Sequence, residues 1–196
     1  MVVSAEKKGV SSTTGMQETV KTSSLFATRA AEVVPKRMRE MEQAILARDF
    51  DTFARVTMRE SNSFHATCLD TDPPIFYLND VSRAAIRAVE AINQQAGRIV
   101  AAYTFDAGPN CVIYYLEKDK KTLAGKLDGC LQGKKGWIGG NGEKGEGLGK
   151  ELGQVEETLR GGVSRIIMTS VGEGPISVQE HLIDETGTVE DDELTI

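Results

Sequence analysis

The stretch from Ile99 to Leu116 constrains the fold of this chain more than any other part of its sequence. Two β-like runs, Ile99–Thr104 and Cys111–Leu116, flank a hexapeptide that is rich in turn-forming residues. Its glycine permits a sharp turn, and the proline that follows has a fixed φ of its own. The pattern therefore predicts an antiparallel hairpin. The hexapeptide is Phe105-Asp106-Ala107-Gly108-Pro109-Asn110.

Asp106 is the main candidate catalytic residue. It follows the first β-like run directly, at the rim of the predicted sheet, where a carboxylate held in place can act as a general base. Aspartate is also one of the residues that ordinary turns favour, so a solvated turn residue is the alternative interpretation.

Helical and strand-like patterns on both sides of the hairpin indicate the rest of the fold. We expect the α+β class, with one antiparallel sheet and helices packed on one of its faces, in a single domain over residues 1–183. The expected elements are a strand at Val2–Ala5, a helix over Thr14–Glu32 capped by Ser11, Ser12 or Thr13, a helix that begins near Pro35, a helix through Phe53 and Phe64, a helix from Asn79-Asp80 to Gly97, a short helix over Glu151–Leu159 and a buried strand over Arg165–Val171.

The segment 117–150 is the most unusual part of the composition. Eight of the 17 residues from Gly133 to Gly149 are glycine. Ordering such a run costs much backbone entropy, so we expect a mobile glycine-rich loop over 117–150. No apolar strand precedes Gly136–Gly149, which favours a plain loop over a phosphate-binding one. We expect residues 184–196 to form an acidic surface tail.

The overall composition excludes several classes of protein. A net charge of −6 argues against nucleic acid or an anionic membrane as the main partner. No apolar run approaches the roughly 18 residues that a membrane span needs. The three cysteines are scattered, which predicts reduced thiols in a cytoplasmic setting and no metal site.

Four motifs carry a resemblance to a known family. They are Val10–Met16, Glu60–Asp70, Pro73–Asp80 and Ala102–Asn110, and they occur in this order. Together they closely resemble the carboxyl-terminal half of the fungal diphosphomevalonate decarboxylases, which belong to the GHMP kinase superfamily. The likeness is near-continuous from Val2 to Leu116 and returns at Arg165–Pro175. It implies the GHMP carboxyl-terminal domain fold and a role in the mevalonate pathway to isoprenoids.

The resemblance also implies a set of site residues. Asp106 would orient or deprotonate the tertiary hydroxyl of the substrate before ATP phosphorylates it. Ser12 and Thr13 would lie beside the substrate, with simple helix capping as the alternative. Gly15 and Met16 would shape the wall of the site. Asn62 and His65 lie three residues apart, on one expected helix face. A lone histidine is more often a structural residue than a catalyst, so a structural His65 is the alternative.

Three positions depart from the family pattern, namely Gly9, Asp72 and Cys111. The family usually has aspartate at the first, an aromatic or small residue at the second and a small residue such as alanine at the third. These changes lie close to the matching site loops, so they bear on whether the original substrate is retained.

The complete family enzyme is about twice as long, and its amino-terminal half carries the phosphate-binding loop. We therefore expect no cofactor for this chain alone, whereas the complete enzyme uses ATP and Mg²⁺. The expected partners are a small-molecule substrate and either a second copy of the chain or a missing amino-terminal half. Two alternatives stay open, namely an ATP-independent enzyme that uses Asp106 as general acid or base and a non-catalytic dimerising module.

Overall fold

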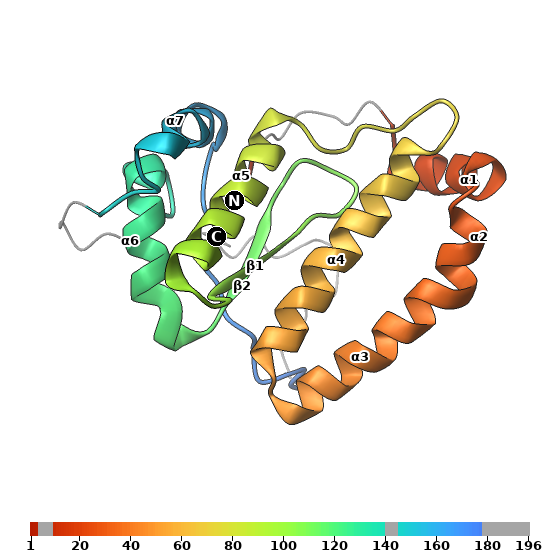
Figure 1. The fold of residues 1–196 in the computed structure, drawn as a ribbon, viewed down its shortest axis with the longest axis horizontal. Helices are drawn as coiled ribbons and strands as arrows, with labels where there is room; N and C mark the ends of the chain where they lie inside the picture. Colours follow the sequence, from red (N-terminus) through yellow and green to blue (C-terminus); the bar gives the residue numbers. More distant parts are fainter. Residues whose placement is uncertain (4–9, 140–144, 178–196) are drawn as a thin grey trace, which may run out of the picture.

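The computed structural model describes residues 1–3, 10–139 and 145–177 of the chain. Figure 1 shows a helix-rich molecule with one small hairpin between the long helices. The elements are α1 (Ser12–Thr22), α2 (Phe26–Thr28), a π-helical turn (Arg29–Val33), α3 (Val34–Ala47), α4 (Phe50–Leu69), α5 (Asp80–Ala96), β1 (Ala101–Thr104), β2 (Val112–Tyr115), a 3-10 turn (Glu117–Asp119), α6 (Lys120–Leu131), a second 3-10 turn (Lys150–Leu152) and α7 (Gly153–Gly162).

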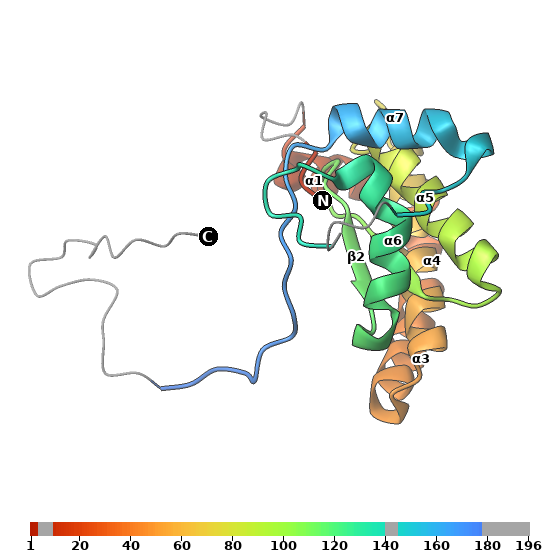
Figure 2. The same ribbon diagram turned by 90° about the vertical axis from the view of Figure 1, so that its left-hand side faces the viewer.

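The predicted hairpin is confirmed. β1 and β2 pair antiparallel, with Ala101 opposite Tyr115 and Thr104 opposite Val112. Both α4 and α5 contact β1, and Figure 2 shows these helices on one side of the hairpin and the segment 164–177 on the other. The expected α+β class with an antiparallel sheet is therefore confirmed.

The helix ends that the sequence signals most strongly are also confirmed. Asn79 caps α5, since its side chain accepts a hydrogen bond from Ser82 N while the Ser82 hydroxyl bonds back to Asn79 N. Gly97 ends the helix at a φ of 65°, in the left-handed region that glycine tolerates best. These two ends place β1 directly after α5.

The single helix expected over Thr14–Glu32 is wrong, because α1 ends at Thr22. The Asp70 carboxylate accepts hydrogen bonds from Ser23 Oγ at 2.8 Å and from Leu25 N at 3.0 Å, so it stabilises a break at this point. These bonds hold the pKa of Asp70 below its usual value. The chain then continues through the π-helical turn into α3, where Pro35 occupies the first turn as expected.

The loop expected over 117–150 is also wrong for its first part, which forms α6. Leu123, Leu127 and Leu131 recur every four residues and are buried in the main core with α5, β1 and α7. The later glycines have a packing role as well. A Cβ at Gly136 would overlap Ile166 O, and one at Gly145 would overlap Gly125 O, so glycine permits a close approach of backbones at both places.

The buried strand expected over Arg165–Val171 does not form. Arg165 makes isolated bridges to Val2 and Lys135, but the following residues are irregular and Val171 is 97% exposed. Of the expected strand at Val2–Ala5, Val2 makes this bridge, while residues 4 and 5 lie outside the described residues. The acidic tail at 184–196 also lies outside them.

A partly buried charge cluster holds the π-helical turn and α3 against α4. Glu60 on α4 accepts hydrogen bonds from Arg29 and from Arg37, which both have mostly buried side chains. These bonds keep the pKa of Glu60 below its usual value although its partial burial opposes that effect. Within the described residues, no helix is both long and apolar enough to cross a membrane.

If α6 is part of the core, shortening one of its leucines must destabilise the chain. We expect Leu127→Ala to lower the free energy of unfolding by about 3 kcal/mol, because it removes buried methyl groups and leaves a cavity. Leu46→Ala on α3 is the control, with an expected change of less than about 0.5 kcal/mol since Leu46 is 85% exposed. Equal effects in urea denaturation would contradict the placement of α6.

Candidate active site

Asp106 lies on the turn between β1 and β2 and is exposed to solvent. Phe105 N donates to Ser61 Oγ on α4 at 3.1 Å, and Ser82 Oγ on α5 donates to Pro109 O at 2.9 Å. A third bond, from Gly108 N to Asp106 O at 2.7 Å, tightens the turn itself. Two helices therefore fix the backbone on both sides of an exposed carboxylate.

His65 lies beneath this turn and is only 7% exposed. Its ring centroid is 6.2 Å from that of Phe105 and 6.5 Å from that of Tyr77. Burial lowers the pKa of His65, while a hydrogen bond with the Phe105 backbone and the charge of Asp106 act in the opposite direction. The side chain is buried too deeply for open contact with a substrate, so its contacts indicate support of the Asp106 turn.

The amino terminus of α1 presents the expected hydroxyls to solvent. The N-cap is Ser11, whose Oγ accepts from Thr14 N at 3.1 Å, and it is neither Ser12 nor Thr13. Ser12 and Thr13 are both exposed in the first turn. The hydroxyls of Ser12 and Thr13 are therefore not used for capping. The start of a helix also offers free backbone N–H groups and a favourable dipole to an anion.

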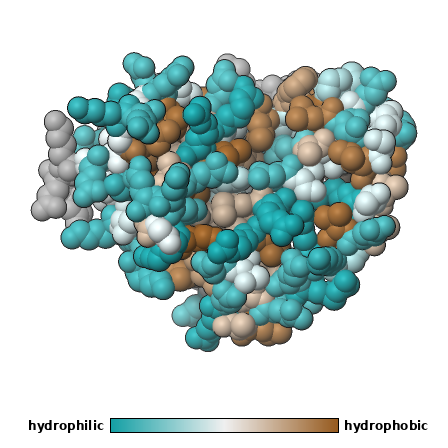
Figure 3. All heavy atoms as spheres, in the orientation of Figure 1, coloured by the Kyte–Doolittle hydropathy of each residue, from teal (hydrophilic) through white to brown (hydrophobic). Residues whose placement is uncertain are grey.

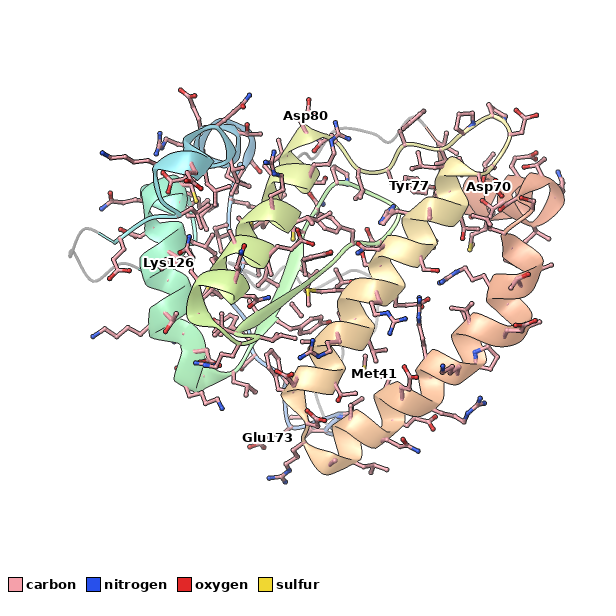
Figure 4. All side chains as sticks on the ribbon, in the orientation of Figure 1. Met41, Asp70, Tyr77, Asp80, Lys126 and Glu173 are labelled. Atoms are coloured by element: carbon pink, nitrogen blue, oxygen red, sulfur yellow. The ribbon has the colours of Figure 1, made fainter. Side chains whose placement is uncertain are left out.

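Tyr77 joins α1 to the rest of the site (Figure 4). Its hydroxyl donates to Ser11 O at 3.4 Å, and a Cβ at Gly15 would overlap that hydroxyl. Gly15 is therefore required for the close approach of α1 to Tyr77, while Met16 is 60% exposed beside it. Tyr77 belongs to a small apolar cluster that links α1, α4 and the hairpin turn and consists of Cys68, Ile75 and Tyr77 with Val10, Phe64 and Ala107.

Asn62 has a partner inside the fold. Its Nδ2 donates to Tyr103 Oη at 3.0 Å, and the hydroxyl lies 3.2 Å from its Oδ1. Because Tyr103 is buried on β1, this pair ties α4 to the sheet. The side chain of Asn62 is therefore bound within the fold. His65, three residues later, lies against the turn that carries Asp106.

Some residues of the site were missed by inspection of the sequence. Ser61, Ser82 and Tyr77 hold the site together but carry no chemical signature of their own. Their only signals were the capping position of Ser82 and the place of the other two within long family motifs.

The departures from the family pattern have separate structural settings. Cys111 is buried, and burial raises the pKa of its thiol to about 12, which favours packing over reactivity. Asp72 is exposed, and Gly9 lies outside the described residues.

In the part of the chain that the structure describes, no group of three histidine, cysteine, aspartate or glutamate side chains is placed to hold a metal ion.

Comparisons with known proteins place this chain among known sequences and structures. Residues 1–178 match the family model of the mevalonate 5-diphosphate decarboxylase C-terminal domain. The diphosphomevalonate decarboxylase of Aspergillus fumigatus is 56% identical over 96% of this chain and 49% of its own length. That of Gibberella zeae is 59% identical over 93% of the chain and 47% of its length. The chain therefore spans about half the length of these curated relatives.

Solved structures give the same result. A crystal structure of mevalonate 5-diphosphate decarboxylase superposes with a TM-score of 0.79 and 42% identity, over 94% of this chain and 49% of that one. The mevalonate diphosphate decarboxylase of Trypanosoma brucei covers 63% of the chain and 33% of its own, with a TM-score of 0.60 and 46% identity.

The contact between Gly15 and Tyr77 can be tested by a double-mutant cycle. We expect Gly15→Ala to lower the free energy of unfolding by about 1–3 kcal/mol, because the added methyl overlaps a buried hydroxyl. Tyr77→Phe removes that hydroxyl and should recover most of the loss in the double variant. Gly125→Ala on α6 is the control, since its added methyl meets nothing within 4 Å and should be neutral or stabilising. Additive effects of the two changes would argue against the contact.

The burial of His65 predicts how stability depends on pH. The folded chain holds the pKa of His65 below 6.5, so the unfolded chain takes up the proton first. The free energy of unfolding should therefore fall as the pH drops through about 6.5, and His65→Phe should weaken that dependence. Urea titrations between pH 8 and 5 measure it, and NMR follows the imidazole directly, with His181→Gln to assign the other histidine. A His65 pKa above 6.5 would contradict the burial.

Proposed function

The chain belongs to the mevalonate 5-diphosphate decarboxylase family, of which it represents the carboxyl-terminal domain. From this premise we propose that the domain forms one wall of a diphosphomevalonate decarboxylase active site. In this proposal Asp106 orients or deprotonates the substrate hydroxyl, and catalysis needs the half of the enzyme that this chain does not span.

The fixed backbone of the Asp106 turn is the observation that carries the proposal. Ser61 and Ser82 bind the turn from two different helices, and His65 packs beneath it. The carboxylate itself makes no hydrogen bond or ion pair with any described residue. An acceptor held in this way can meet a hydroxyl without first breaking another contact, which favours proton transfer.

The start of α1 suits the charged part of such a substrate. Ser12 and Thr13 offer exposed hydroxyls and backbone donors, and the first turn of the helix contains no acidic residue. The apolar cluster around Tyr77 links this helix start to the turn that carries Asp106. Anionic groups of the substrate would therefore lie at α1 while its hydroxyl lies at Asp106.

ATP and Mg²⁺ would be held by the other half of the enzyme. The described residues contain no strand followed by a glycine-rich loop and a helix, and their acidic groups form no cation site. The role of this chain is therefore to bind and orient the hydroxy acid and to accept a proton.

Self-association and a cytoplasmic location stay predictions. Figure 3 shows hydrophobic patches that are separated by hydrophilic side chains on the face in view. Met38, Ile45 and Leu46 on α3 are exposed apolar residues that a second copy of the chain could cover.

Complementation tests the proposed function. The chain is combined or fused with the amino-terminal half of the A. fumigatus relative, and release of carbon dioxide from diphosphomevalonate is measured with Mg-ATP. We expect Asp106→Asn to lower kcat by about 100-fold or more, the scale of losing a general base, with little change in Tm. Asp80→Asn is the control, because Asp80 is an exposed aspartate paired with Arg83 on the surface of α5.

Two results would contradict the proposal. Unchanged turnover in Asp106→Asn would remove Asp106 from the chemistry. Turnover of a substrate by the chain alone, without ATP, would favour the ATP-independent enzyme, which also depends on a carboxylate in a cleft.

A further inference from the structure

His65 is a buried titratable side chain beneath the turn that carries Asp106, and one of its ring nitrogens has no partner among the described residues. The residue is 7% exposed. Its Nε2 is buried and makes no hydrogen bond with any residue that the structure describes. A buried polar atom without a partner costs free energy, so its presence in a packed interior needs a physical reason.

Three aromatic rings pack against the imidazole. Its centroid lies 5.0 Å from that of Phe64, 6.2 Å from that of Phe105 and 6.5 Å from that of Tyr77, at interplanar angles of 72°, 81° and 76°. These edge-to-face contacts fix the orientation of the imidazole ring. Because apolar surroundings disfavour a charged ring, they also favour the neutral form of His65.

The backbone of Phe105 identifies the ring nitrogen that carries the proton. Phe105 N already donates to Ser61 Oγ at 3.1 Å, so the carbonyl oxygen of Phe105 is the group left to bond with the imidazole. A carbonyl oxygen only accepts, and Nε2 takes no part, so Nδ1 is the donor. The neutral ring therefore has its proton on Nδ1 and a lone pair on Nε2.

Ser61 and His65 together hold both backbone polar groups of the residue before Asp106. They are four residues apart on α4 and therefore lie on one face of that helix. Ser61 binds the N–H of Phe105, and His65 binds its carbonyl group, which belongs to the peptide bond that leads into Asp106. The imidazole thus restricts the rotation of this peptide group and, with it, the direction of the Asp106 side chain.

The charge of the ring matters as well as its position. The titratable groups around it are Asp106 on the turn, Tyr77 on the segment before α5 and Cys68, three residues further along α4. Burial raises the pKa of Tyr77 and that of Cys68, so both groups are neutral at pH 7. The charge that acts on the ring is that of Asp106. An imidazolium beneath this carboxylate would oppose its uptake of a proton.

We propose that His65 is a positioning residue for the reaction at Asp106, because its neutral ring holds the Phe105 carbonyl through Nδ1 and leaves Asp106 without a cation beneath it. This role rests on the proposed function, since it requires Asp106 to accept the proton of the substrate hydroxyl. The lone pair on Nε2 has the same explanation. An acceptor beside Nε2 would stabilise the charged ring, and none of the described residues supplies one.

Two amide substitutions separate the two ring nitrogens. The amide of His65→Asn lies where Nδ1 lies and can still donate to Phe105, whereas that of His65→Gln lies further out, near the place of Nε2. In the complementation assay we expect His65→Gln to lower kcat by about 10- to 100-fold with little change in KM, the scale of a misplaced catalytic group. His65→Asn should keep kcat close to that of the unchanged chain.

Leu127→Ala is the control for stability. It weakens the main core, to which the Asp106 side chain does not belong, and should leave kcat unchanged at a temperature where every variant is folded. The pH profile gives a readout that a merely structural histidine would not move. The kcat of the unchanged chain should fall as the pH drops through the pKa of His65, which lies below 6.5. His65→Asn cannot take up a proton there and should keep its turnover to lower pH.

Two measurements on the chain alone need no catalysis. Nitrogen chemical shifts of the imidazole report the tautomer, and we expect the proton of the neutral ring on Nδ1. Amide exchange is followed at Phe105 and at Gly108, which donate to Ser61 and to Asp106 O. Exchange at both amides should quicken by about tenfold in His65→Gln and stay unchanged in His65→Asn.

A neutral ring with its proton on Nε2 would overturn the proposal, as would equal kcat values in His65→Asn and His65→Gln. If Asp106→Asn abolishes turnover while His65→Gln leaves it unchanged, the proposed function stands and this role of His65 falls. If the complemented enzyme has no turnover at all, the proposed function fails, and the tautomer and the exchange rates still decide whether His65 holds the turn.

Discussion

The hydrogen bond from Phe105 N to Ser61 Oγ fixes the end of β1 on α4, and the site depends on it. A buried N–H at the end of a strand has lost its sheet partner and must find another acceptor. Here the acceptor comes from the middle of a 20-residue helix, so the turn takes up the rigidity of that helix. His65, one helical turn further along α4, packs against the same residue. Asp106 is exposed, but its backbone is held in place because the preceding residue, Phe105, is buried and bonded to Ser61.

The same helix organises the rest of the site through apolar contacts. Cys68 on α4 packs with Tyr77, and Gly15 allows α1 to approach the tyrosine hydroxyl closely. Asp70, just beyond the end of α4, binds Ser23 and Leu25 and so ends α1 at the required length. One helix thus sets the positions of both the start of α1 and the carboxylate of Asp106. In the proposed function, a hydroxy acid with an anionic group would use both.

The other side of the hairpin has a different character. There the sheet is short, with an apolar cavity at its edge and the irregular segment 166–169 along one wall of that cavity.

The sequence by itself determined the hairpin, the caps of α5, the family and the place of Asp106 on the turn, because each depends on residues that are close together in the chain. It did not reveal α6, since the leucine spacing was outweighed by the many glycines that follow, and it placed a strand at Arg165–Val171 whose pairing needs a distant partner. The break after Thr22 was decided by Asp70, which lies 47 residues from Ser23. Only the tertiary structure could show that His65 lies under the turn and that Asn62 binds Tyr103, because burial and hydrogen bonding between distant segments are products of packing and not of local pattern.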